Sequence, residues 1–261
     1  AHLTVRDQTW ATSLLLCLAD LVETKQGDCA ETNFFQAQRN KVYSYGNRLI
    51  CDWKNKEAYF RWGNSEIYRK FFVDYQNFLK RPVEIGREIA SSYASDDNVY
   101  VVSMDLSRFY DCIDRSELSK KLQKLLEQQD EKLCPNFWRV FKKVTNWEWS
   151  DEGKKRAGSI GVNLGSGLPQ GLVASGFFAN AYMLDFDAYI GSRIGSIIPG
   201  SKGIVIHDYC RYVDDVRLVI SIDNQKLYGN IQDSLTKWID DSLGKTVGKE
   251  TKINTAKTKI T

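Results

Sequence analysis

Apolar residues recur at helical spacing near the start of the chain, and they predict an amphipathic helix over residues 8–24. Asp7 is a candidate N-terminal cap for this helix, and Gly27 is a candidate stop signal. The predicted apolar face consists of Trp10, Leu14, Leu18, Leu21 and Val22. The following residues, 28–98, interleave aromatic and basic side chains. This mixture is typical of a core with a solvated face, and a surface that holds phosphates and stacks bases is the alternative.

The second part of the chain alternates between strand and helix patterns. A continuous apolar run at residues 99–104 predicts a strand that ends at Asp105. Asp114 and Glu117 then form a helix-start pattern, in which the Asp oxygen caps amides, and leucines follow at helical spacing. A second helix is expected over about residues 173–190, after a loop with strong turn chemistry.

The last hundred residues carry a hairpin pattern. Short apolar runs at 204–213 and 216–220 flank Asp214 and Asp215, so these aspartates are expected at the tip of a hairpin. A helix pattern at 227–239 follows, capped by Asp223 or Asn224, and a short strand is expected within 252–260. The order β, α, α, β, β, α, β fits an α+β fold. It can be laid out as a ferredoxin-like split βαβ antiparallel sheet with helices on one face.

This layout places Asp105 beside Asp214 and Asp215, although more than one hundred residues separate them in sequence. Taken alone, an Asp pair at a hairpin tip is most often a turn. Carboxylates that converge repel each other unless cations lie between them, and oxygen ligands favour Mg²⁺ or Mn²⁺. Two such ions about 3.5–4 Å apart would support in-line phosphoryl transfer.

Composition narrows the class of protein but does not name a partner. The 261 residues are 43% hydrophobic, 12% aromatic and 26% charged, as in globular proteins, and the net charge of +3 does not announce a nucleic-acid binder. Six cysteines without Cys-x-x-Cys spacing and only two histidines disfavour a zinc site and fit reduced thiols. No apolar run reaches the length of a membrane span, and no secretory signal is visible, so a cytoplasmic protein with no membrane partner is expected.

Four segments, in order, resemble the motifs of reverse transcriptases. Residues 104–110 resemble motif A, 167–175 motif B, 212–215 motif C and 253–258 motif D. The resemblance covers about residues 99–261. The phrasing of motif B, continuing through Asn180, is most similar to bacterial abortive-infection and other defence-associated reverse transcriptases.

The resemblance implies a right-hand polymerase palm at 99–261 with inserted fingers elements, and largely helical fingers at 1–98. No thumb is recognisable, so a thumb or a partner protein is expected to supply the grip on duplex. An Ala start and a Lys/Thr-rich end fit a partial or processed chain.

The resemblance also implies roles for single residues. Asp105 and Asp214 would hold the Mg²⁺ or Mn²⁺ pair together with the Leu106 carbonyl, and Asp215 would assist at the primer end. Gln170 and Gly171 would line the nucleotide and template pocket, Gly171 because a missing side chain admits close backbone approach. Lys257 would lie near the triphosphate as a proton donor. A surface lysine on a terminal strand is the alternative for Lys257.

The remaining nucleotide contacts are expected in motif A and in the fingers. Tyr110 would lie beneath the incoming sugar and exclude a ribose 2′-hydroxyl, which favours deoxynucleotides, although core packing is the alternative. Ser107, Arg108 and Phe109 accompany it in motif A, with Phe109 the better candidate for the core. A Gly-Gly-x-Arg-like hairpin that would clamp the triphosphate is absent, and the substitutes are Arg48, Arg69 and Lys70.

The resulting hypothesis is an RNA-directed DNA polymerase that adds deoxynucleotides to a 3′-hydroxyl, in a bacterial antiphage system. Its partners would be a dNTP, an RNA template, and a nucleic-acid or protein primer, with a dedicated noncoding RNA and an oligomer left open. Template-independent or protein-primed synthesis by the same site is one alternative. A non-catalytic RNA-binding scaffold is another, and the three aspartates argue against it. Tyr110 disfavours an RNA-building polymerase.

Overall fold

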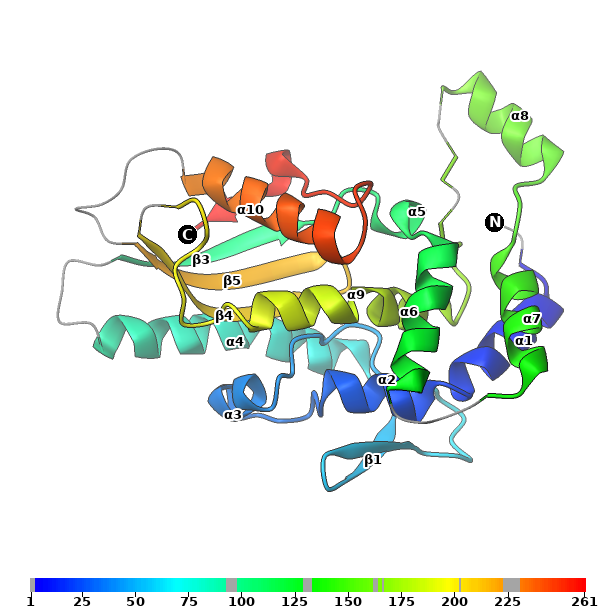
Figure 1. Ribbon diagram of the computed structural model, residues 1–261, viewed down its shortest axis with the longest axis horizontal. Helices are drawn as coiled ribbons and strands as arrows, with labels where there is room; N and C mark the ends of the chain where they lie inside the picture. The colour runs from blue at the N-terminus through cyan, green and yellow to red at the C-terminus, as the bar shows by residue number, and fades with distance from the viewer. Residues whose placement is uncertain are drawn as a thin grey trace.

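The structure is a computed structural model that describes residues 3–92, 98–128, 133–161, 164–165, 167–201, 203–222 and 231–261. Its centre is a four-stranded antiparallel sheet with strand order β4-β5-β3-β6 (Figure 1). The strands are β3 (Asn98–Asp105), β4 (Ile204–Tyr212), β5 (Asp215–Ile222) and β6 (Lys259–Ile260). The predicted first strand and hairpin are therefore present, whereas the last strand is shorter than expected.

Helices cover both faces of the sheet. Successive strand residues point to opposite faces, so neighbouring residues pack in different clusters. Val102, Met104 and Leu218 belong to the main core, to which α9 (Ser175–Gly191) and α10 (Ile231–Thr246) also contribute. Val219, next to Leu218, packs instead with Ile85 of α4 (Phe71–Ser92). The two palm helices lie on one face, as expected, and α4 from the N-terminal part covers the other face (Figure 1).

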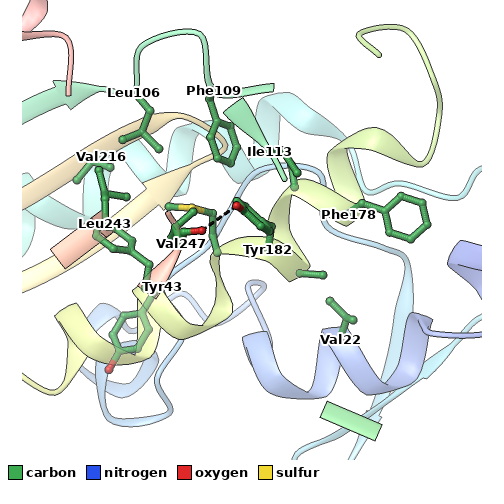
Figure 2. Packing of buried hydrophobic residues seen from close by; sticks show 14 of the residues in the cluster. Val22, Tyr43, Leu106, Phe109, Ile113, Phe178, Tyr182, Val216, Leu243 and Val247 are labelled. Atoms are coloured by element: carbon green, nitrogen blue, oxygen red, sulfur yellow. Dashed lines mark hydrogen bonds between the residues drawn. The ribbon is translucent and has the colours of Figure 1, made fainter. Parts of the chain in front are cut away.

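Helix α9 lies in the middle of the core. Its apolar residues surround the helix, and Phe177, Phe178, Met183 and Phe186 are fully buried. In Figure 2, Tyr182 lies near Phe109 of motif A and Val247 after α10, whereas Phe178 points away from these residues on the same helix. The Tyr182 hydroxyl donates to the Val247 carbonyl at 2.7 Å, which fixes the end of α10 against α9.

The N-terminal part holds two helices where one was expected. They are α1 (Val5–Leu16) and α2 (Ala19–Gln26), and the break at Cys17 and Leu18 turns Leu18 fully into the core. The cap of α1 is Thr4, with Asp7 as its partner three residues later in a capping box. Gly27 ends α2 at φ 73°, as predicted.

Several elements were not predicted. In the N-terminal part they are α3 (Phe34–Arg39), α4 and the hairpin β1 (Cys51–Lys54) and β2 (Glu57–Phe60). Between motifs A and B they are α5 (Phe109–Cys112), α7 (Pro135–Thr145) and α8 (Asp151–Ser159).

The remaining elements agree in part with the sequence. Helix α6 (Arg115–Glu127) has the expected cap, since the Asp114 carboxylate accepts from the Ser116 and Glu117 amides. A 3₁₀ turn, η1 (Thr255–Lys257), occupies part of the expected last strand. The candidate caps Asp223 and Asn224 of the last helix lie outside the described residues. Within the described ranges, no helix is both long and apolar enough to cross a bilayer.

Candidate active site

Three aspartates meet where β3 ends and β5 begins. Asp105 and Asp215 are direct partners in the antiparallel register. The Leu106 amide donates to the Asp214 carbonyl at 2.9 Å, which ties the chain after β3 to the hairpin tip. The N–H and C=O of a strand residue point to the same side, so the Leu106 carbonyl faces the hairpin as well. Residues far apart in sequence thus form one acidic edge.

The aspartates at this edge carry like charges, which repel one another. Burial raises the pKa of Asp214, and the neighbouring charges of Asp215 and Asp105 raise it further. Burial also raises the pKa of Asp215, with Asp105 as the next contribution. The ionised forms are therefore disfavoured unless a cation lies among them.

Lys257 supplies such a cation in this structure. Its Nζ lies 3.0 and 3.1 Å from the two carboxylate oxygens of Asp105. The Asn254 amide donates to the Asp105 carbonyl at 2.8 Å, and this bond sets η1 beside the end of β3. The hydrogen bond to Asp105 raises the pKa of Lys257, so the ammonium form is favoured. The expected lysine at the site is thus in contact with the first aspartate.

The donor chemistry at the acidic edge suits a hard divalent cation. Asp105, Asp214 and the Leu106 carbonyl offer oxygen ligands only, and the Lys257 ammonium already shows that Asp105 accepts a cation. Across the described ranges, no three His, Cys, Asp or Glu side chains are arranged as a ready metal cluster. A divalent ion held by Asp105 would take the place of the Lys257 ammonium, which contacts both oxygens of that carboxylate.

A buried ion pair holds the hairpin tip from behind. The Arg211 guanidinium is fully buried and lies 2.7 Å from the Asp187 carboxylate on α9. Arg211 also donates to the Val213 carbonyl at 2.8 Å and to Asn180 Oδ1 at 3.1 Å. The Asn180 amide in turn donates to the Gly46 carbonyl at 2.6 Å. Helix α9 is thereby connected to the turn that carries Asp214.

The turn itself has an unusual backbone. Val213 has φ 56°, in the left-handed region that β-branched residues rarely adopt. Gly46 lies against it, and a Cβ added at Gly46 would approach the Val213 amide nitrogen to 2.8 Å. Strain of this kind costs of order 1–3 kcal/mol and persists where surrounding contacts fix the conformation. The Arg211 hydrogen bond and the Gly46 contact are those constraints.

Tyr110 lies close enough to the acidic edge for the charge of Asp214 to affect it. Burial raises its pKa to about 12, and the Asp214 charge is the second cause. Its hydroxyl lies 3.5 Å from the Asn47 amide nitrogen. The motif B loop crosses directly over motif A, since the Leu168 amide donates to the Tyr110 carbonyl at 2.8 Å. A Cβ at Gly167 would lie only 1.9 Å from that carbonyl oxygen, so this crossing requires glycine.

The motif B loop exposes Gln170 and Gly171. Gly171 has φ +96°, and an added Cβ would meet nothing within 4 Å, so its backbone conformation explains the glycine here. Gln8 of α1 holds the loop, donating to the Gly171 carbonyl and accepting from the Val173 amide, both at 2.9 Å. The N-terminal helix therefore positions this loop.

Two predicted nucleotide contacts are corrected by the structure. Arg48 is buried and lies 2.7 Å from Glu23, so its charge is already neutralised inside the protein and cannot clamp a triphosphate. Phe109 is 2% exposed and packs in the core. Neither side chain reaches the surface at the acidic edge.

The other predicted contacts remain at the surface. Arg69 pairs with Asp74 at 3.0 Å and keeps partial exposure, while Lys70 is exposed directly before α4. Arg108 is exposed, has φ 47° and pairs with Asp111 at 3.2 Å. The Ser107 amide donates to the Lys252 carbonyl at 2.8 Å. The structure does not connect Arg69 or Lys70 to the aspartates by any contact among the described residues.

Sequence reasoning missed Asn47, Asp187 and Arg211. Asn180 lay within the extended motif B but received no role. A charged residue directly before motif C, in a strand that also holds His207 and Asp208 among apolar residues, was the available signal for Arg211. Its partner Asp187 gives no such signal, because pairing between strand and helix depends on the tertiary fold.

A sequence model of the family described as reverse transcriptase (RNA-dependent DNA polymerase) matches residues 68–261. This chain belongs to the reverse transcriptase family. The match begins before motif A and includes α4. The family assignment agrees with the palm-and-fingers fold expected from the motifs. No curated protein matched the chain.

Solved telomerase structures are similar to this reverse transcriptase chain at low identity. Telomerase from Candida albicans, in complex with a fragment of telomeric RNA, is 15% identical with a TM-score of 0.42. The alignment covers 71% of this chain and 30% of that one. Apo telomerase from Candida tropicalis is 13% identical with a TM-score of 0.42, over 71% and 32% of the two chains. This chain thus spans about a third of the length of those proteins, and the family assignment rests on the family match.

Proposed function

We propose that this chain is the catalytic part of an RNA-directed DNA polymerase that adds deoxynucleotides to a 3′-hydroxyl. The observation that carries the proposal is the pairing of Asp105 with Asp215, together with the Leu106 bond to Asp214. It brings three carboxylates to one accessible edge of the sheet in a chain that belongs to the reverse transcriptase family. A non-catalytic scaffold gains nothing from placing several like charges side by side.

Asp105 and Asp214, with the Leu106 carbonyl, would hold divalent ions, with Mg²⁺ the first candidate and Mn²⁺ the second. Bound there, the ions would activate the attacking oxygen and stabilise the leaving oxygen of an in-line displacement. Asp215 follows Asp214 directly and would assist at the primer end. The Arg211 pair holds the turn, so that Asp214 keeps its position when charges nearby change.

The chain's own residues also define the nucleotide side of the site. The Tyr110 ring would lie under the sugar and collide with a 2′-hydroxyl, and Asn47 lies beside its hydroxyl. Gln170 and Gly171 would border the base and the template strand. With divalent ions held at Asp105, Lys257 would give up its contact with that carboxylate, and its ammonium would serve as the proton donor to the pyrophosphate leaving group.

The template and biological setting are finer parts of the proposal. RNA is the proposed template because the family comprises RNA-dependent DNA polymerases. A bacterial antiphage role is supported by the phrasing of motif B, and a cytoplasmic location is a separate part of the proposal. Template-independent or protein-primed synthesis would use the same carboxylates. It differs in requiring no RNA template, or in leaving product attached to a protein hydroxyl.

Incorporation of labelled nucleotides tests the proposal. The protein is incubated with Mg²⁺ or Mn²⁺, a DNA primer on an RNA template, and either dNTPs or rNTPs. We expect dNTP incorporation that depends on template and falls by more than about 10²-fold in Asp214→Ala. Equal labelling by wild type and Asp214→Ala would remove the catalytic assignment. Incorporation without template would favour the template-independent alternative.

A further inference from the structure

A cavity of about 860 Å³ lies outside the acidic edge, between α1, α7, α8 and the motif B loop. Its size is within the range of about 300–1,000 Å³ found for ligand sites. In Figure 1, α7 lies beside α1 at the end of the molecule away from the C-terminus, and α8 projects from the same end. Pro169 and Leu172 of the motif B loop form one side of the cavity.

Three tryptophans contribute to this cavity. Trp10 on α1 lines the cavity and is 46% exposed, so much of its indole ring is open to contact with a ligand. Trp147 and Trp149, between α7 and α8, lie edge to face with ring centroids 5.1 Å apart. Their indole N–H groups donate to the Gly167 and Gly165 carbonyls at 2.8 and 2.9 Å. These bonds fix the rings.

Basic side chains surround the aromatic rings. The cavity lining includes Arg6, Arg139, Lys143 and Arg156, and none of these cations forms an ion pair with a residue that the structure describes.

The carboxylates in the lining are differently placed. Asp7 is held by Thr4 in the α1 capping box, and Glu148 lies 4.0 Å from Lys154. Glu152 lies in the first turn of α8, where the helix dipole favours a negative charge. The lining thus carries four cations against these three carboxylates, a small excess of positive charge.

We propose that this cavity binds an unpaired stretch of nucleic acid outside the catalytic carboxylates, by stacking bases on Trp10 and pairing phosphates with Arg139 and Lys143. Aromatic faces beside a basic lining are the recurring means of holding single strands. This inference deepens the proposed function, since it assigns a second contact for a strand that the polymerase site would handle.

The cavity is connected to the catalytic region through the motif B loop. Gln8 binds the loop at Gly171 and Val173 from α1, and the two indoles bind it at Gly165 and Gly167. A strand in the cavity would therefore contact the same loop that carries Gln170. Its position, between α1 and the loop, fits a strand that passes from the surface toward the site.

Anisotropy of a labelled single-stranded RNA or DNA oligonucleotide, measured without divalent ions so that no synthesis occurs, tests the proposal. We expect Trp10→Ala to weaken binding about 5- to 150-fold, the range for losing one stacked base. Arg139→Glu/Lys143→Glu should lower the slope of log affinity against log salt by about 1.4 for two lost phosphate contacts. The matched control is Lys80→Glu/Arg87→Glu, an exposed Lys and Arg pair on α4, which should leave the affinity and slope unchanged.

Several outcomes would overturn the inference. Unchanged affinity in both cavity variants, with melting temperatures that show intact folding, removes the site. Equal binding of duplex, or of heparin with no effect of Trp10→Ala, shows a general polyanion surface and not a single-strand site. Because binding is measured without synthesis, Trp10-dependent binding by a protein that incorporates no nucleotide supports the cavity and removes the polymerase proposal. Normal nucleotide incorporation by a protein that shows no Trp10-dependent binding removes the cavity proposal and supports the polymerase proposal.

Discussion

At the scale of single residues, the contact between Lys257 and Asp105 would govern how the proposed site responds to a divalent ion. The Lys257 ammonium is paired with the Asp105 carboxylate, which divalent ions would need as a ligand. The lysine side chain itself is exposed. At the proposed site, a metal ion and the lysine would therefore compete for the same oxygen atoms. The exchange requires no change in the core, because Lys257 belongs to a surface turn.

Replacing Lys257 tests this competition. In Lys257→Met, Mg²⁺ should bind the free protein a few-fold more tightly because no ammonium competes, while nucleotide incorporation should decrease because the proton donor is lost. Calorimetric titration of Mg²⁺ and a parallel incorporation assay separate the two effects. Lys259→Met, on β6 and exposed, is the control. Weaker Mg²⁺ binding in Lys257→Met would contradict the competition.

Tyr110 provides a second prediction at this scale. Tyr110→Ala removes the ring under the proposed sugar position, so discrimination against rNTPs should fall by at least about tenfold. Tyr110→Phe loses only the weak contact to Asn47 and should keep the discrimination. The ratio of kcat/KM for dNTP and rNTP measures the effect. If the Ala variant folds and still discriminates like wild type, the ring only packs.

Sequence patterns located the acidic residues but not the buried basic residues. Strand ends and the hairpin tip follow from short apolar runs that end at aspartates, and laying these elements out as a split βαβ sheet brings Asp105 beside Asp214. Arg48 looked like a surface clamp because burial of an arginine depends on a distant partner, here Glu23. Arg81 with Asp208 and Arg211 with Asp187 are further cases.

At the scale of elements, β4 carries two buried ion pairs with different positions relative to the site. Arg211 pairs with Asp187 next to the hairpin tip, and Asp208 pairs with Arg81 of α4 further back on the strand, both at 2.7 Å. All four side chains are nearly or fully buried. The two pairs on one strand therefore allow a comparison. Loss of the Arg211 pair should affect the turn that carries Asp214, whereas loss of the Arg81 pair should affect only the stability of the fold.

Arg211→Lys should reduce nucleotide incorporation per folded molecule, since one ammonium cannot replace the fork that binds both Asp187 and the Val213 carbonyl. Breaking a buried pair costs about 3–5 kcal/mol, and Arg211→Lys, which keeps the charge, should cost less. Arg81→Lys should cost similar stability but keep kcat. Melting temperatures and steady-state kinetics at matched folded fractions compare them. Equal kcat in the two variants would show that Arg211 acts on stability alone.

Elements were predicted best where local signals were complete. The cap at Asp114 and the stop at Gly27 follow from side chains within a few residues, and both are present. The break between α1 and α2 and the position of α4 under the sheet follow from burial, which is decided by the whole fold. None of the four reverse-transcriptase motifs includes α7 or α8, although both helices line the cavity that contains Trp10.

At the scale of the whole molecule, the acidic edge is a site where the fold gives up stability. The raised pKa values of Asp214 and Asp215 mean that the folded chain binds their protons more tightly than the unfolded chain. Stability contributed by these groups therefore falls as pH rises through the carboxylate range. At neutral pH, the metal-free protein has the full cost of their repulsion and burial.

Asp214→Asn should therefore melt at a higher temperature than wild type at neutral pH without metal, by about 2–4 °C for each kcal/mol of repulsion removed. The difference should shrink as the pH falls toward the range where the carboxylates are protonated. Saturating Mg²⁺ should reverse the order, because binding at about 100 times Kd stabilises wild type by about 2.7 kcal/mol and the variant lacks a ligand. Differential scanning calorimetry with and without Mg²⁺ measures both effects. Asp233→Asn, on the exposed face of α10, is the control and should shift little in either condition. A variant that melts below wild type in the absence of metal would show that Asp214 stabilises the fold, and the view of this edge as a binding site built at the expense of stability would be wrong.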